Sequence, residues 1–174
     1  ILCLAMLLLI APGALADTQA VNPEPAQDWP AISAGDLRFS LDVAGFRAAK
    51  GATYQEVYLL IPGGQLAFRS GSDGAEVAGF TVNLSVVAAS GDTLHQEHLQ
   101  RRTTSPGSDT ELGVSSVVDV IPVTLRPGAS SLSVVVSDEE SGREGVIRIP
   151  FPVRQYGKKR LVLSDIALGT DLSR

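Results

Sequence analysis

The sequence predicts an all-β fold, an immunoglobulin-like two-sheet antiparallel β-sandwich of seven to eight strands. Apolar side chains recur at every second position over much of residues 36–153, which is the period of a strand with one buried face. Clusters of Gly, Pro, Asp and Ser interrupt these stretches at roughly ten-residue intervals, as in sandwiches and barrels. No apolar stripe of helical period occurs beyond the first residues. These patterns place a sandwich domain at residues 36–155.

The first half of this domain contains the clearest alternation. Strands are expected at 37–43, 57–61 and 80–88, and a short candidate strand lies at 65–69. The strand at 80–88 has one continuous apolar face, made of Phe80, Val82, Leu84, Val86 and Ala88.

The second half continues the pattern and places prolines in its strands. Apolar, β-branched residues run from 114 to 125, and further strands are expected at 132–136 and 146–153. Pro150 and Pro152 share one face of the last strand. Because proline donates no backbone N–H, this strand is expected at the edge of a sheet or at its end.

The segment 93–102 is polar on both faces and contains both histidines of the chain. Polar side chains suit an edge strand, where they discourage further pairing. His95, Glu97 and His98 are the natural candidates for a metal site or an acid–base pair. On a strand, however, positions i and i+3 face opposite sides, so the two imidazoles are not expected to converge on one ion. We therefore expect exposed edge residues here.

Other chemical signatures are equally weak. The acids Asp138, Glu139 and Glu140 fall at an expected hairpin, where a solvated turn explains them better than a calcium site. The sequence has no G-x-S-x-G elbow, no HExxH spacing and no P-loop. We predict no catalytic, cofactor-binding or metal-ligating residue, and hence a protein that is not an enzyme.

The start of the chain reads as a targeting segment followed by a linker. Residues 1–16 combine an uncharged apolar run with Ala14-Leu15-Ala16, the order of a signal peptide and its cleavage site. A retained membrane anchor is the alternative, although the run is short for a spanning helix. Residues 17–35 hold three prolines and are expected to form a linker. The leader resembles one that lacks its basic N-terminal part, which indicates truncation.

The composition limits the partners. The formal net charge is −5, and 14 Lys and Arg residues are spread along the chain, so nucleic acid is not expected as a partner. The single cysteine, Cys3, lies in the leader. Cleavage would leave a domain without disulfides even in an oxidising compartment.

The segment 156–174 follows the last expected strand. A basic cluster at 158–160 precedes the apolar sequence LVLSDIALG. It is expected to be a linker, or the start of a C-terminal region that is missing, although a last strand of the sandwich is also possible. Because an extended apolar segment can pair with a sheet edge, we expect a partner-docking segment formed by Leu161, Leu163, Ser164, Asp165 and Ile166.

Four stretches, FSLDVAGFRA, QEVYLLIP, QLAF and RLVLSDIAL, follow one another in an order that resembles the N-terminal half of GWxTD domain-containing proteins. The resemblance covers roughly residues 36–168. It implies an exported bacterial protein of the periplasm or cell surface, in which a β-sandwich precedes a domain carrying the Gly-Trp-x-Thr-Asp motif. That motif does not occur in this sequence. The family's activity is unknown, so the resemblance supplies no catalytic residue.

Two functions from different classes follow as expectations. The first is a non-enzymatic binding or scaffolding module, whose partner is another protein or the C-terminal domain of the same chain. The alternative is an accessory domain of an envelope enzyme whose catalytic domain lies beyond residue 174. Glycan binding is less favoured, since the chain has one Trp, three Tyr and five Phe, and most of the Phe residues fall at core positions.

Overall fold

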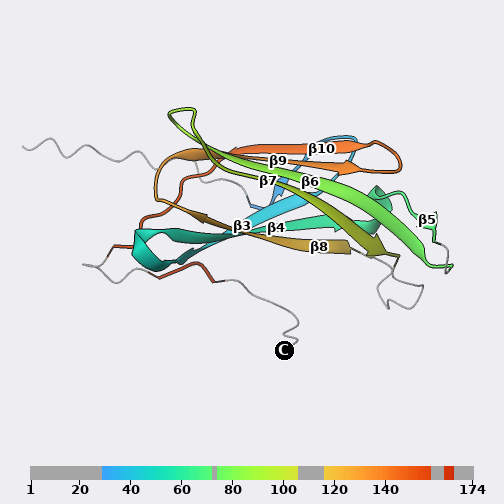
Figure 1. Cartoon of the computed structure of the whole chain (residues 1–174), viewed down its shortest axis with the longest axis horizontal. Coiled ribbons are helices and arrows are strands. Elements are labelled where there is room, and N and C mark those ends of the chain that lie inside the picture. The colour runs from blue at the N-terminus through green and yellow to red at the C-terminus, as the bar shows by residue number, and fades with distance from the viewer. Residues whose placement is uncertain (1–28, 72–73, 106–115, 158–162, 167–174) are drawn as a thin grey trace, which may run out of the picture.

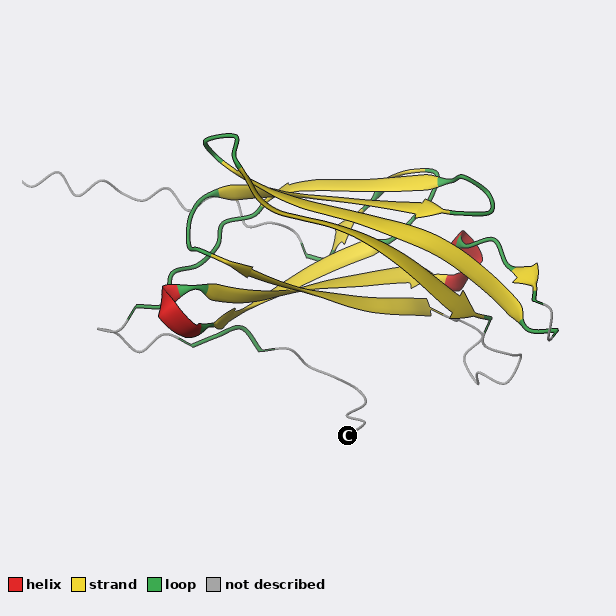
Figure 2. Ribbon diagram, viewed as in Figure 1, coloured by secondary structure: helices red, strands yellow, loops and turns green. Residues whose placement is uncertain are grey.

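The computed structural model describes residues 29–71, 74–105, 116–157 and 163–166. Its strands form two antiparallel sheets that pack face to face (Figures 1 and 2). The first sheet contains four strands, β1 (Ala31–Ile32), β3 (Ser40–Arg47), β4 (Thr53–Pro62) and β8 (Ser116–Leu125). The second contains six, β2 (Ala34–Gly35), β5 (Arg69–Ser70), β6 (Glu76–Ala88), β7 (Thr93–Thr104), β9 (Ser130–Asp138) and β10 (Glu144–Pro150).

The order of strands is β1-β3-β4-β8 in the first sheet and β2-β10-β9-β6-β5 in the second, where β7 pairs with the other edge of β6. The expected all-β sandwich is confirmed. Seven of the strands are long and three have only two residues. In the described part of the chain, no helix is long and apolar enough to cross a membrane.

The core lies between the sheets, where the alternating apolar faces meet. Most of the expected inward residues of 37–43 and 80–88 are buried, including Phe39 and Phe80 at 2% and 1% exposure, while Val43 and Ala88 are half-buried. The largest fully buried side chains come from both sheets: Phe39, Phe80, Leu37, Leu41, Leu59, Ile61, Leu84, Ile121, Leu132, Val57, Val82 and Val86. A period of two therefore identified the buried face of β3, β4, β6, β9 and β10, whereas no buried face was expected for β7 or assigned for β8.

The linker expected at 17–35 is wrong for its last residues, because Ala31–Gly35 belong to the sandwich. Ala31 pairs with Leu41 of β3, and Gly35 pairs with Gly145 of β10, so this short segment pairs with both sheets. Between them the buried Ser33 hydroxyl donates to the Leu37 carbonyl and accepts from the Phe39 N–H, both at 2.9 Å. Two-residue strands have no period to detect, which is why the sequence pattern missed them.

The candidate strand at 65–69 is also wrong in most of its length. The chain forms a 3₁₀ turn, η2 (Gly63–Gln65), and the Leu66 N–H donates to the Gly63 carbonyl at 3.2 Å. The two glycines after Pro62 favour this turn over a strand. Pairing resumes only at Arg69, opposite Val77 of β6.

Candidate functional site

The expected docking segment lies against the edge of β3 in its described part, residues 163–166. The Asp165 N–H donates to the Gly45 carbonyl at 3.0 Å, and the Gly45 N–H donates to Asp165 Oδ2 at 2.8 Å. The Arg47 N–H makes a longer contact of 3.5 Å with Ser164 Oγ. Ser164 and Asp165 therefore occupy backbone groups at an edge of the sandwich.

A second layer of contacts holds this arrangement. Arg154 Nη1 donates to Asp165 Oδ1 at 3.0 Å, so the carboxylate bridges a guanidinium and a backbone amide. The hydroxyl of the buried Tyr156 donates to the Gly45 carbonyl at 2.6 Å. The Thr53 hydroxyl donates to the Arg154 carbonyl at 2.7 Å, which fixes the chain between β10 and the segment.

The apolar residues of the segment point away from this contact. Leu163 is 74% exposed and Ile166 is 81% exposed. The structure thus separates the five expected docking residues by role: two polar ones contact the sandwich, and two apolar ones face solvent. Leu161 lies outside the described residues. The linker expected from residue 156 onward likewise starts later, because Tyr156 is part of the sandwich.

The histidines behave as the strand geometry predicts. Half-buried His95 faces inward on β7, 3.3 Å from Glu97 Oε2, whereas His98 faces out and its Nδ1 lies 2.6 Å from Asn83 Oδ1. Within the described residues, no group of three His, Cys, Asp or Glu side chains is placed to hold a metal ion. The two imidazoles do not meet.

The acids at the β9–β10 hairpin diverge. Asp138 is buried and accepts the Ser141 N–H at 3.0 Å, which closes the turn. Glu139 lies over Gly79, where an added Cβ would come within 2.2 Å of its carboxylate. Glu140 lies 3.9 Å from the guanidinium of Arg69. Each acid therefore has a separate structural role.

The outer face of the first sheet carries a Tyr–Glu–Tyr row on β4. The Tyr58 hydroxyl donates to Glu56 Oε2, and this hydrogen bond, with burial and the Glu56 charge, raises the pKa of Tyr58 to about 12. Burial and the same carboxylate also raise the pKa of Tyr54. Both phenols therefore stay protonated at neutral pH, and neither is activated as a base or nucleophile.

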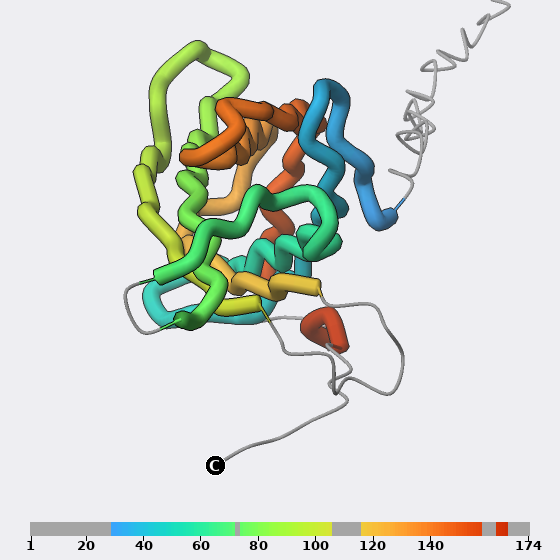
Figure 3. The backbone as a smooth tube through the Cα atoms, turned by 90° about the vertical axis from the view of Figure 1, so that its right-hand side faces the viewer, coloured from blue at the N-terminus to red at the C-terminus, as the bar shows by residue number. Residues whose placement is uncertain are grey.

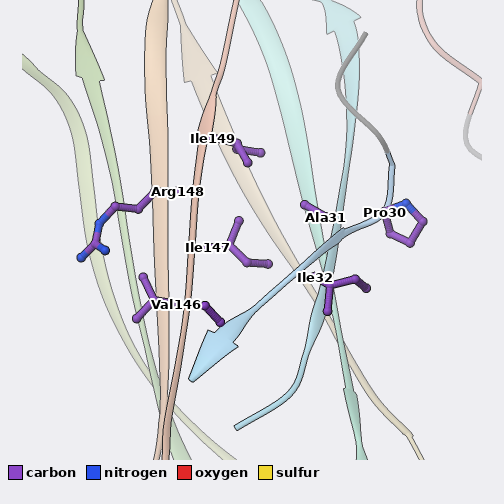
Figure 4. Close-up of a pocket in the computed structure, with 8 residues that line it drawn as sticks. Pro30, Ala31, Ile32, Val146, Ile147, Arg148 and Ile149 are labelled. Carbon is purple, nitrogen blue, oxygen red and sulfur yellow. The ribbon is translucent and has the colours of Figure 1, made fainter. Parts of the chain in front are cut away.

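A groove of about 440 Å³ lies between the N-terminal segment and β10 (Figure 4). Pro30, Ala31 and Ile32 face the strand residues Val146–Ile149 across it. Among its described lining residues only Arg148 is charged, and none is an acid or a histidine. The groove can hold an apolar group but offers no acid–base pair.

Comparison with known proteins adds little. No protein-family model and no curated protein matches the chain. One similar solved structure is described as "X-ray structure of Northeast Structural Genomics Consortium target SoR45", with 12% identity and a TM-score of 0.37. The match covers 76% of this chain and 96% of that one.

Sequence reasoning named Asp165 but missed its partners Gly45 and Arg154, and also Tyr156. Gly45 and Asp165 are separated by 120 positions, and a strand glycine gives no signal for its partner. Arg154 and Tyr156 lie in the stretch expected to be the end of the domain and a linker. The only available signal was Asp165 itself, an acid inside an otherwise apolar run.

Proposed function

We propose that this chain is a non-enzymatic binding module of an exported bacterial envelope protein. The observation that carries the proposal is the arrangement of residues 163–166, whose polar residues bind the sandwich and whose apolar side chains are exposed. Asp165 is fixed to Gly45 through two hydrogen bonds, while Leu163 and Ile166 stand in solvent. Exposed aliphatic side chains on an anchored segment are suited to insertion into an apolar pocket of another protein.

Export and family remain parts of the same proposal. The apolar run and Ala-x-Ala of residues 1–16 support a signal peptide. The four stretches quoted above support a relation to the N-terminal half of GWxTD domain-containing proteins. Fractionation of cells that express the native protein tests the location, and recovery in the cytoplasm alone contradicts it.

Site-specific photocrosslinking in the native host tests the docking proposal. A photoreactive residue replaces Leu163 or Ile166, and the matched control replaces Gln100, an exposed residue of the polar strand β7. We expect a discrete protein adduct from both segment positions and none from the control. The adduct should disappear when Asp165→Ala releases the segment. Equal labelling at all three positions contradicts the proposal.

A further inference from the structure

The free edge of β8 differs from every other described edge of the sandwich. β8 pairs with β4 on one side, and no described residue pairs with its other side (Figure 1). Its outward side chains Val118 and Val120 are 63% and 42% exposed. Next to them on β4, Leu60 is 42% exposed and lies directly opposite Val118.

Hydrogen-bond alternation shows which backbone groups of β8 are free. Gly45 of β3 bonds toward the segment, and Phe39, just before β3, bonds toward Ser33, so the odd-numbered residues face away from β4. The ladder from β3 through β4 to β8 is continuous, with no register shift. Because N–H and C=O of one residue point to the same side of an antiparallel strand, the even residues of β8 face outward. These are Ser116, Val118, Val120, Pro122 and Thr124.

The other edges are protected. β7 carries His, Glu, Gln and Arg side chains along its length. The edge of β10 beyond β2 presents Arg148 and Pro150 by the same alternation, because Arg143 and Phe151 bond toward β9. The edge of β3 is covered by β1 and by residues 164–165. Ile32 on β1 and Leu94 on β7 are single exposed aliphatic residues at edges, whereas β8 carries two in succession on outward-facing backbone positions, Val118 and Val120.

We propose that β8 pairs antiparallel with β8 of a second copy of this chain, with Val118 opposite Val118 of the partner subunit. An antiparallel strand pair around a two-fold axis is self-complementary, since the same row of donors and acceptors serves both copies. In this register Val118 exchanges both backbone bonds with its counterpart, and Ser116 pairs with Val120 of the partner subunit.

Pro122 and Asp119 disfavour the neighbouring register in which the partner strand is shifted toward Pro122. A shift by one pair, with Val118 opposite the partner's Val120, would place the partner's Pro122 opposite Ser116, where proline has no N–H to donate. The same shift would bring Asp119 opposite the partner's Asp119, and like charges in that position repel. In the proposed register Asp119 faces the partner's Val117 and keeps its 2.7 Å contact with Arg101.

The outer face gains contacts in this register. The Val118 side chains of both copies meet at the axis, flanked by Val120 and Leu60 from each. These three are the exposed aliphatic side chains that β4 and β8 carry on the outer face of the first sheet. The two first sheets then join into one continuous sheet. This surface is separate from the 163–166 segment, so the dimer and the docking proposal can fail independently.

Sedimentation equilibrium of the full chain tests the dimer. We expect a reversible dimer in the micromolar range, and Val118→Lys should raise the dissociation constant about tenfold or more, because two like charges then meet. Val120→Pro removes an N–H that the monomer does not use and should also weaken the dimer. Thr124→Pro is the control. The Thr124 N–H also faces away from β4, but it lies beyond the residues that pair in the dimer, so this variant should dimerise normally. A monomer at every concentration, or a dimer that tolerates both variants, overturns the proposal.

Disulfide trapping tests the register in a Cys3→Ser background. Opposed Cα atoms at Val118 would be about 5.5 Å apart, within the range that a disulfide bridges. The two Val120 positions would lie on the order of 13 Å apart. We expect Val118→Cys to give a covalent dimer on oxidation and Val120→Cys to give little. Equal trapping of both variants overturns the register.

Discussion

The two lateral sides of the sandwich differ in how their edge strands are joined. On one side the segment Ala31–Gly35 (blue in Figure 3) pairs with β3 and then with β10, so backbone hydrogen bonds join the sheets. On the other side β7 and β8 end their sheets, and Arg101 Nε donates to Asp119 Oδ2 at 2.7 Å between them. We call these the closed side and the open side. The difference shows that backbone pairing within the chain joins the two sheets on the closed side. On the open side, β8 has an edge that can pair with another strand.

The largest expected effect comes from disturbing the closed side at Gly145. A Cβ there would lie 2.1 Å from the Leu37 carbonyl oxygen, which is backbone and cannot rotate away. We expect Gly145→Ala to lower the free energy of unfolding by about 3 kcal/mol, as in overpacked sites. Urea denaturation measures this change in the free energy of unfolding.

Gly64→Ala is the matched control, because an added Cβ there meets nothing within 4 Å. It should change the stability by less than about 0.5 kcal/mol. If both variants unfold at the same urea concentration, the close approach of residues 35–37 to β10 is not a constraint on the fold.

The open side should respond more weakly. Arg101 and Asp119 have side chains 35% and 17% exposed, so solvent screens their attraction in part. A double-mutant cycle with Arg101→Ala and Asp119→Asn is expected to give a coupling of about 1 kcal/mol, which decreases with added salt. A coupling free energy as large as the loss expected for Gly145→Ala would contradict the view that the open side contributes less to stability than the closed side.

The docked segment should contribute still less to stability. The Asp165 carboxylate is 40% exposed and its partner Arg154 is 54% exposed. We expect Asp165→Ala to lower the free energy of unfolding by about 0.5 kcal/mol, while the segment becomes more accessible to protease. A loss of several kcal/mol would instead mean that residues 163–166 are part of the folding core.

The smallest expected effect on stability is at Tyr58, which lies in the middle of the first sheet and belongs to neither the closed nor the open side. Its pKa is raised from 10.0 to about 12. Since the protonated phenol is the favoured form, this stabilisation is present below pH 10 and is lost as the pH rises toward 12. Absorbance titration of tyrosinate should show a lower pKa in Glu56→Gln, and an unchanged titration would contradict the role of Glu56.

The sequence predicts the long strands because each one buries a single face. The period-two face of Phe80, Val82, Leu84 and Val86 is buried as expected, and the opposite orientations of His95 and His98 follow from strand geometry. The polar pattern of 93–102 also predicts an edge strand, which β7 is.

The features that distinguish the two sides were not predictable in the same way. β1 and β2 are too short to have a period, and Asp165 reaches Gly45 across 120 positions. Residues 114–125 are rich in apolar, β-branched residues but do not alternate clearly, so the sequence does not show which face is buried. The structure shows that Val118 and Val120 lie on the outer face of the first sheet, and that among the described strands β8 pairs with β4 alone.

Residue-resolved amide hydrogen exchange tests the contrast most directly. In dilute protein the account predicts slow exchange at Gly45 and at Asp119 and Ile121, whose amides are bonded, and fast exchange at Val118 and Val120. Protection at these two valines should rise as the concentration increases, while the others stay constant. Slow exchange along all of β8 in the dilute monomer, or fast exchange at Gly45, would contradict the account.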